Sequence, residues 1–281
     1  MWPDRRLIEL FGIEHPIIQA PMAGSGKADL VVAVSEAGGL GSLGCAVMTA
    51  EEVRTQLGII RQRTAKPINV NFFTHKAPAG ADGRERGWRQ RLAPYYAELG
   101  LDPASAPSGA GRAPFDNAYC ELMTELKPKV VSFHFGLPET ALLKRVKDAG
   151  SIVVASATTV EEAHWLEDNG VDAVVAQGFE AGGHRGMFLT EDLTSQAGTM
   201  ALVPQIVDAV RLPVIAAGGI GDARGIAAAF MLGAAGVQLG TAYLFCPEST
   251  ISPLHRAALK AGREDRTALT NVFTGRPARG L

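Results

Sequence analysis

The stretch QGFEAGGHRG, residues 177–186, places one histidine among four glycines. An imidazole changes its charge near neutral pH, so His184 is a candidate for taking up or giving back a proton in a reaction. Glycines beside the ring leave room for a ligand, although the same residues also build ordinary surface turns. The alternative interpretation is therefore an exposed loop histidine without a chemical role.

Three amide side chains end apolar runs: Asn71 in NVNFF, Gln177 in DAVVAQG and Gln238 in AGVQLGT. An amide both donates and accepts, and a buried one needs partners, so three amides at one edge indicate ligand contact. His134 ends the run KVVSFHFG and is a second candidate, either for substrate contact or for binding a backbone carbonyl. Thr74, close after Asn71, is a further candidate for substrate contact.

Two glycine loops have the composition of a phosphate site. In AAGGIGDARG, Gly218 and Gly219 let backbone N–H groups approach an anion, and Asp222 can cap the helix that follows. In QLGTAY, Gly240 and Thr241 add an N–H group and a hydroxyl. A third stretch, QAPMAGSG, offers a rigid apolar shelf that suits a flat aromatic ring, although a methionine such as Met22 is more often core packing.

These residues lie on a repeated pattern of short apolar runs, each followed by a helix-like stretch, which is typical of parallel strands joined by helices. The pattern predicts a single (β/α)8 TIM barrel over residues 1–281, with a doubly wound sheet as the alternative. In such a barrel the candidate residues meet at the carboxyl ends of the strands. The eight expected strands lie within 16–24, 39–45, 68–73, 129–136, 151–157, 172–178, 213–219 and 235–241.

The interval 74–128 is too long for a simple crossover, and we expect an inserted excursion over the barrel mouth. It should contain a helix over WRQRLAPYYAELG, residues 88–100, and a mobile tip at 103–114.

Composition limits the choice of partners. A formal net charge of -2 and 47% hydrophobic residues indicate a globular protein that does not bind nucleic acid. Three widely spaced cysteines argue against disulfides and a zinc site, so no metal is expected. Because the chain shows no signal peptide and no long apolar segment, we expect a cytoplasmic protein that does not contact membranes. A homo-oligomer is compatible with these observations.

The motifs PIIQAPMAG, NVNFF, VSFHFG, AQGFEAGGHRG, AAGGIGDARG and QLGTAYLFCPES occur in this order, and across nearly the whole chain the sequence resembles the nitronate monooxygenases, formerly called 2-nitropropane dioxygenases. The resemblance implies an FMN-dependent oxidoreductase that uses O2 to convert alkyl nitronates to carbonyl compounds and nitrite. It also implies that His184 acts on the α-carbon of the nitro compound or steadies its nitronate. The residues expected at FMN are Ala20, Pro21, Met22, Ala23, Asn71, Gln177, Gly182, Gly218, Gly219, Gln238, Leu239, Gly240 and Thr241.

The chain departs from the family in two places. Some members carry a catalytic histidine on the fifth strand, where SIVVASATT has none, and members usually continue with a further helix, so we expect a shortened chain. Two other functions remain open at this point. One is an FMN-dependent enoyl-acyl carrier protein reductase that uses NAD(P)H. The other is a barrel that binds a phosphorylated ligand without redox chemistry.

Overall fold

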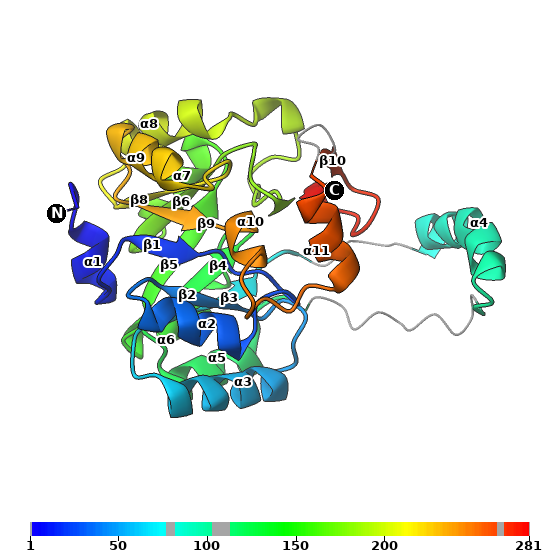
Figure 1. Cartoon of the computed structure of the whole chain (residues 1–281), viewed down its shortest axis with the longest axis horizontal. Coiled ribbons are helices and arrows are strands. Elements are labelled where there is room, and N and C mark those ends of the chain that lie inside the picture. Colours follow the sequence, from blue (N-terminus) through cyan, green and yellow to red (C-terminus); the bar gives the residue numbers. More distant parts are fainter. Residues whose placement is uncertain (1, 77–81, 103–112, 263–266, 281) are drawn as a thin grey trace.

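Eight parallel strands and their interleaved helices form a nearly closed barrel (Figure 1). The computed structural model describes residues 2–76, 82–102, 113–262 and 267–280. Each apolar run predicted as a strand contains one, which confirms the (β/α)8 barrel. The strands are β1 (Ile17–Gln19), β2 (Gly41–Gly44), β3 (Ile68–Phe73), β4 (Val130–His134), β5 (Ile152–Ala157), β6 (Ala173–Gln177), β8 (Val214–Ala217) and β9 (Gly236–Leu239).

Strand pairing excludes the doubly wound alternative. The hydrogen-bonded order is β1-β9-β8-β6-β5-β4-β3-β2, and a parallel bridge between Ile18 and Leu40 brings the two ends of this sheet together. The candidate loops therefore surround one mouth.

The helices around the barrel begin at residues that satisfy their first N–H groups. Thr49 and Glu52 form a capping box at α3, and Thr159 accepts a hydrogen bond from Glu162 N at α7. The longer helices are α2 (Ala28–Glu36), α3 (Ala50–Arg63), α5 (Asn117–Leu126), α6 (Thr140–Asp148), α7 (Val160–Asp168), α8 (Thr199–Ala209), α9 (Ala223–Met231) and α11 (Pro253–Lys260). Short helices are α1 (Arg6–Phe11) and α10 (Thr241–Leu244).

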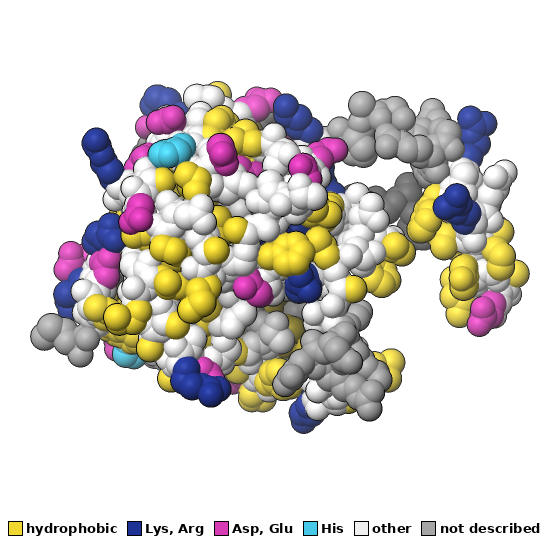
Figure 2. Space-filling view, turned by 90° about the horizontal axis from the view of Figure 1, so that it is seen from above, with side chains coloured by type: hydrophobic (Ala, Val, Ile, Leu, Met, Phe, Trp, Pro, Cys, Tyr) yellow, Lys and Arg dark blue, Asp and Glu magenta, His cyan; other side chains and the backbone are white. Residues whose placement is uncertain are grey.

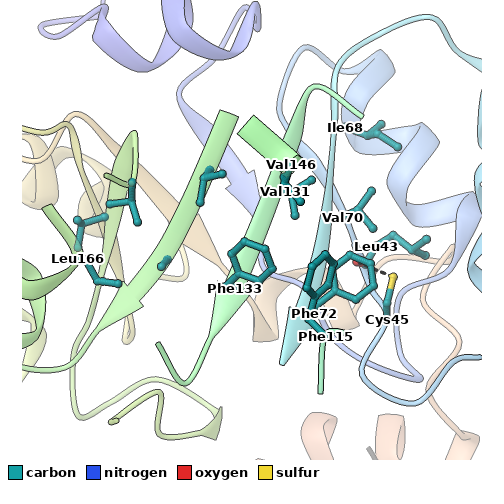
Figure 3. Packing of buried hydrophobic residues seen from close by; sticks show 14 of the residues in the cluster. Leu43, Cys45, Ile68, Val70, Phe72, Phe115, Val131, Phe133, Val146 and Leu166 are labelled. Atoms are coloured by element: carbon teal, nitrogen blue, oxygen red, sulfur yellow. Dashed lines mark hydrogen bonds between the residues drawn. The ribbon is translucent and has the colours of Figure 1, made fainter. Parts of the chain in front are cut away.

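The core has two parts. The larger cluster lies between the helices and the outer faces of the strands, where Phe72, Phe115 and Phe133 pack together (Figure 3). In the smaller cluster, Leu7 and Phe11 of α1 pack with side chains of the strands, so α1 closes the amino-terminal end of the barrel. The opposite end of the barrel, at the carboxyl ends of the strands, is left open for the candidate active site.

The helix expected in the excursion is present as α4 (Asp82–Glu98), which begins earlier than the sequence suggested. Figure 1 shows α4 apart from the barrel, and Figure 2 shows hydrophobic side chains on the surface of this helix. Trp88 and Tyr95 of α4 are exposed. Most of the expected tip, residues 103–112, lies outside the described residues, as do residues 77–81. The place of the excursion over the mouth stays a prediction.

A second, three-stranded sheet was not expected from the sequence. It consists of β7 (Gly183–His184), β10 (Ala268–Thr270) and β11 (Ala278–Gly280), all antiparallel, with Ala278 opposite His184. The C-terminal segment therefore pairs directly with the strand that carries the candidate histidine.

Over the described ranges, none of the helices has both the length and the apolar character required to traverse a bilayer.

Candidate active site

A cavity of about 1000 Å³ opens at the carboxyl ends of the barrel strands. It brings together fourteen of the residues predicted from the sequence: Ala20, Pro21, Met22, Ala23, Asn71, His134, Gln177, Gly182, His184, Gly218, Gly219, Gln238, Gly240 and Thr241. Its size is in the range of pockets that hold a cofactor together with a small substrate.

Two predicted residues are not among those that line the cavity. Leu239 is buried in the larger core cluster. Successive side chains of a strand point to opposite faces, so Leu239 points away from the cavity that its neighbour Gln238 lines. The hydroxyl of Thr74 lies 3.0 Å from the carbonyl oxygens of both His134 and Phe135, to which it donates. The ligand contacts expected of Leu239 and Thr74 stay predictions.

The segment after β1 forms the apolar shelf. Met22 lines the cavity and is only partly buried, so it is not core packing here. The shelf lies against β2, where a Cβ at Gly44 would come within 2.9 Å of Ala23 N. Only glycine at position 44 lets the shelf approach β2 this closely.

The three amides face the cavity with different partners. Asn71 Nδ2 donates to Ser132 Oγ at 2.9 Å. Gln177 Nε2 donates to His184 O at 2.9 Å, and its Oε1 accepts from Gly186 N at 2.7 Å, so this amide holds the backbone around the candidate histidine. The side-chain amide of Gln238 has no hydrogen-bond partner within the described parts of the chain, and it is available to a ligand.

The glycine loops form a cradle. Gly218 and Gly219 have φ of +114° and +68°, which other residues rarely adopt, and a Cβ at Gly218 would lie 2.9 Å from Ala181 N. Across from them, a Cβ at Gly182 would lie 3.8 Å from Thr241 Oγ1. A larger side chain at 182 would therefore project into the gap that separates this loop from α10. The cradle is therefore suited to a phosphate group.

His184 is held by residues from three parts of the chain. Its Nε2 lies 2.9 Å from Thr274 Oγ1, in the segment between β10 and β11. Its ring lies edge-on to Phe73 at 5.7 Å and to Phe135 at 6.0 Å between centroids. His184 is thus a partly buried wall of the cavity and not an exposed loop histidine. Nothing in the sequence pointed to Thr274.

His134 lines the cavity, and both of its ring nitrogens have protein partners. Nε2 lies 3.2 Å from His184 O and Nδ1 lies 3.1 Å from Ser156 Oγ. A carbonyl only accepts, so Nε2 carries the proton and the hydroxyl of Ser156 donates to Nδ1. Burial lowers the pKa of His134 to about 4. This neutral imidazole supports the backbone of His184.

A buried arginine, which the sequence analysis did not single out, holds the loop after β6. Arg185 is 1% exposed and donates to Gln177 O at 2.9 Å, Gly178 O at 2.8 Å and Gln196 Oε1. Burial lowers the pKa of its guanidinium to about 10, and neighbouring Arg279 contributes. An arginine beside a glycine loop resembles a surface residue, so no local signal could have revealed its burial.

Glu162 holds the far end of the same loop. This fully buried carboxylate accepts hydrogen bonds from Thr158 N at 2.7 Å and from Phe188 N at 2.6 Å. Glu162 thus joins the segment after β5 to the loop after β6.

Arg279 on β11 also lines the cavity. Its guanidinium lies 4.9 Å over the ring of Phe179 and donates to Phe179 O. It places a positive charge at the rim, where an anionic ligand would enter. Across the described ranges, no three His, Cys, Asp or Glu side chains are arranged to hold a metal ion.

Comparisons with known proteins agree with this geometry. The family model described as nitronate monooxygenase matches residues 4–281. A nitronate monooxygenase from Pseudomonas aeruginosa is 46% identical over 98% of this chain and 79% of its own length. The structure of nitroalkane oxidase from Streptomyces ansochromogenes has a TM-score of 0.89 at 39% identity, covering 98% of this chain and 78% of that one. FabK from Thermotoga maritima is more distant, with a TM-score of 0.76 at 32% identity, covering 98% and 74%.

Proposed function

The chain belongs to the nitronate monooxygenase family, and from that premise we propose that it binds FMN in the cavity and oxidises alkyl nitronates with O2 to carbonyl compounds and nitrite. The observation that carries the proposal is the arrangement of the cavity. A glycine cradle suited to phosphate, an apolar shelf and His184 all line it.

Each part of the cavity has a task in this proposal. Gly182, Gly218, Gly219 and Thr241 would hold the phosphate, and the backbone of Ala20–Ala23 would lie along the flavin ring. Gln238 offers an unpaired amide to the polar edge of that ring. Bound FMN would supply the redox chemistry, taking electrons from the nitronate and passing them to O2.

The chain's own residues would bind and orient the substrate. His184, whose ring lies edge-on to Phe73 and Phe135, lines the cavity and would meet the nitro compound there. The apolar walls exclude water, which strengthens every charge interaction inside the cavity. The guanidinium of Arg279 would attract an anionic nitronate toward the rim.

Substitution of His184 tests the proposal. His184→Gln should retain FMN, measured by visible absorbance, and lose oxygen uptake with a neutral nitroalkane, whose α-proton must be removed, by a factor on the order of 100 or more. His164→Gln, an exposed position on α7, is the matched control and should behave as wild type. Full activity of His184→Gln would remove His184 from the mechanism, and a colourless protein that does not take up FMN would contradict the cofactor.

The second candidate is reduction of an enoyl-acyl carrier protein with NAD(P)H, because the sequence motifs of the flavin loops do not separate it from nitronate oxidation. The greater similarity to nitroalkane oxidase than to FabK in both identity and TM-score supports the nitronate function. Anaerobic mixing distinguishes the two. Bleaching of the flavin by a nitronate supports the proposal, whereas rapid bleaching by NADH or NADPH with turnover of an enoyl thioester favours the reductase.

A further inference from the structure

Helix α8 begins at a residue whose N–H group is bound by a side chain from another loop. The N-cap, Gly198, has no side chain, and the N–H group of Thr199, the first helical residue, donates to Glu180 Oε2 at 2.8 Å. A Cβ at Gly198 would come within 2.9 Å of Glu180 Oε1, which is closer than real Cβ atoms approach. Glycine at this position therefore lets the carboxylate of the loop after β6 cap α8.

Glu180 brings a negative charge to the phosphate cradle. It is the one carboxylate among the described residues that line the cavity, and a Cβ at Gly219 would lie 3.3 Å from its Cβ. Because like charges repel, this carboxylate would weaken the binding of a phosphate if it turned toward the cradle. Its Oε2 is instead held by the N–H group and the hydroxyl of Thr199, at 2.8 Å and 2.9 Å. There the positive end of the dipole of α8 offsets part of its charge.

Thr199 also fixes the second glycine loop of the cradle. Its Oγ1 lies 2.9 Å from Gly218 O, after β8, and a Cβ at Gly218 would come equally close to this hydroxyl. In the loop after β6, a Cβ at Gly178 would lie 2.5 Å from Thr199 Cα. The hydroxyl proton serves Glu180 or Gly218 at any one time, and the N–H group keeps the carboxylate bound in either case. Both glycine loops thus close on one buried residue.

We infer that Thr199 is a positioning residue for the phosphate of FMN, because it holds the carboxylate of Glu180 on α8 and the backbone of Gly218 in the cradle. The inference rests on the proposed function and deepens it, since it assigns the selection of a phosphorylated flavin to a residue that does not line the cavity. Within the described parts of the chain, its side chain bonds only to Glu180 and to the carbonyls of Ala217 and Gly218. Its hydroxyl should therefore matter for the phosphate and not for the flavin ring.

The binding of FMN and of riboflavin, which has the same ring and no phosphate, tests the inference. Both dissociation constants are measured by quenching of flavin fluorescence on the full chain freed of flavin. Thr199→Val should weaken FMN binding on the order of tenfold and riboflavin binding by less than about threefold, because the lost hydrogen bonds support only the surroundings of the phosphate. Thr199→Ser should restore the wild-type ratio. Thr55→Val, which removes an exposed hydroxyl on α3, is the matched control and should leave both constants unchanged.

Glu180→Gln in the Thr199→Val background separates charge from packing. The substitution keeps the size of the side chain and removes its negative charge, so repulsion of the phosphate ends. The double variant should bind FMN at least about threefold more tightly than Thr199→Val, with no change for riboflavin. If FMN binding does not improve, Thr199 does not act by holding this carboxylate, and the inference is overturned.

Thr199→Ala checks that the loss does not come from the valine side chain. It also lacks the hydroxyl and should repeat the selective loss for FMN. Equal losses of FMN and riboflavin in both variants, or no rescue by serine, would make Thr199 a merely structural residue and overturn the inference.

The outcomes separate the inference from the proposed function. A wild-type protein that binds neither flavin would contradict the cofactor and the inference together. A protein that shows the expected selective loss in its variants, but takes up no oxygen with a nitronate, would contradict the proposed function and leave the role of Thr199 standing.

Discussion

His134 and His184 lie next to each other, but their surroundings give the two side chains different roles. Each ring nitrogen of His134 has a protein partner, and burial lowers its pKa to about 4, so it is neutral at physiological pH. His184 has Thr274 on Nε2 and faces the cavity. The first is therefore a support for the backbone and the second is the candidate for proton transfer.

The lowered pKa of His134 predicts a dependence of stability on pH. Between pH 6.5 and 4 the unfolded chain binds a proton at this residue that the folded chain does not. The free energy of unfolding therefore keeps the contribution of neutral His134 above pH 6.5. It loses this contribution as the pH falls toward 4, by at most about 3 kcal/mol. Urea unfolding measured from pH 7.5 to 4.5 should show a smaller decrease in the free energy of unfolding for His134→Gln than for wild type. An unchanged slope would mean that His134 is not held neutral, and His164→Gln serves as the control.

At the scale of elements, the loop after β6 and the C-terminal segment form one unit around the cavity. Arg185 donates hydrogen bonds to Gln177, Gly178 and Gln196 within the loop. The C-terminal strand β11 pairs with β7 of the same loop. The loop is the wall that carries His184, so its stability and the activity are coupled.

Arg185→Met tests this coupling. The substitution removes the donor from two buried carbonyls and from the partly buried Gln196 side chain, and we expect the free energy of unfolding to fall by about 2–4 kcal/mol. Oxygen uptake with a nitronate should fall as well, although Arg185 does not line the cavity. Arg211→Met, at an exposed position, is the control for loss of a positive charge. Wild-type stability and activity in Arg185→Met would show that the loop is held by other contacts.

At the scale of the whole molecule, the barrel leaves its carboxyl end open, and the loops there form a space whose walls come from both termini. Ala20 and Gly280 line the same cavity. A ligand that fills it touches segments far apart in the sequence, and its binding energy adds to the stability of the fold.

Gly182→Leu tests the cradle. The leucine side chain would project into the gap beside Thr241, where the phosphate is expected. FMN at a hundred times its Kd should stabilise the wild type by about 2.7 kcal/mol and raise its Tm, and this rise should be absent in the variant. Gly58→Ala, in open space on α3, should keep the full shift. An equal shift in Gly182→Leu would place the phosphate elsewhere.

The sequence predicted the elements that depend on local pattern. Each of the eight barrel strands lies inside one of the predicted apolar runs, and Asp222 caps α9 as expected. The second sheet was missed because β7 has two residues and β10 and β11 have three each. Strands so short show no alternation, and the pairing of β7 with β11 joins residues about 90 apart in the chain.

The amino-acid sequence by itself determined the barrel, the glycine loops and the choice of His184, because periodicity, backbone freedom and side-chain chemistry are properties of short stretches. Only the tertiary structure decided what each polar group does. It joined Thr274 to the ring of His184, placed Arg185 inside the loop and gave both nitrogens of His134 protein partners. Hydrogen bonding and burial depend on which distant segments meet, and the folded chain alone brings those segments together.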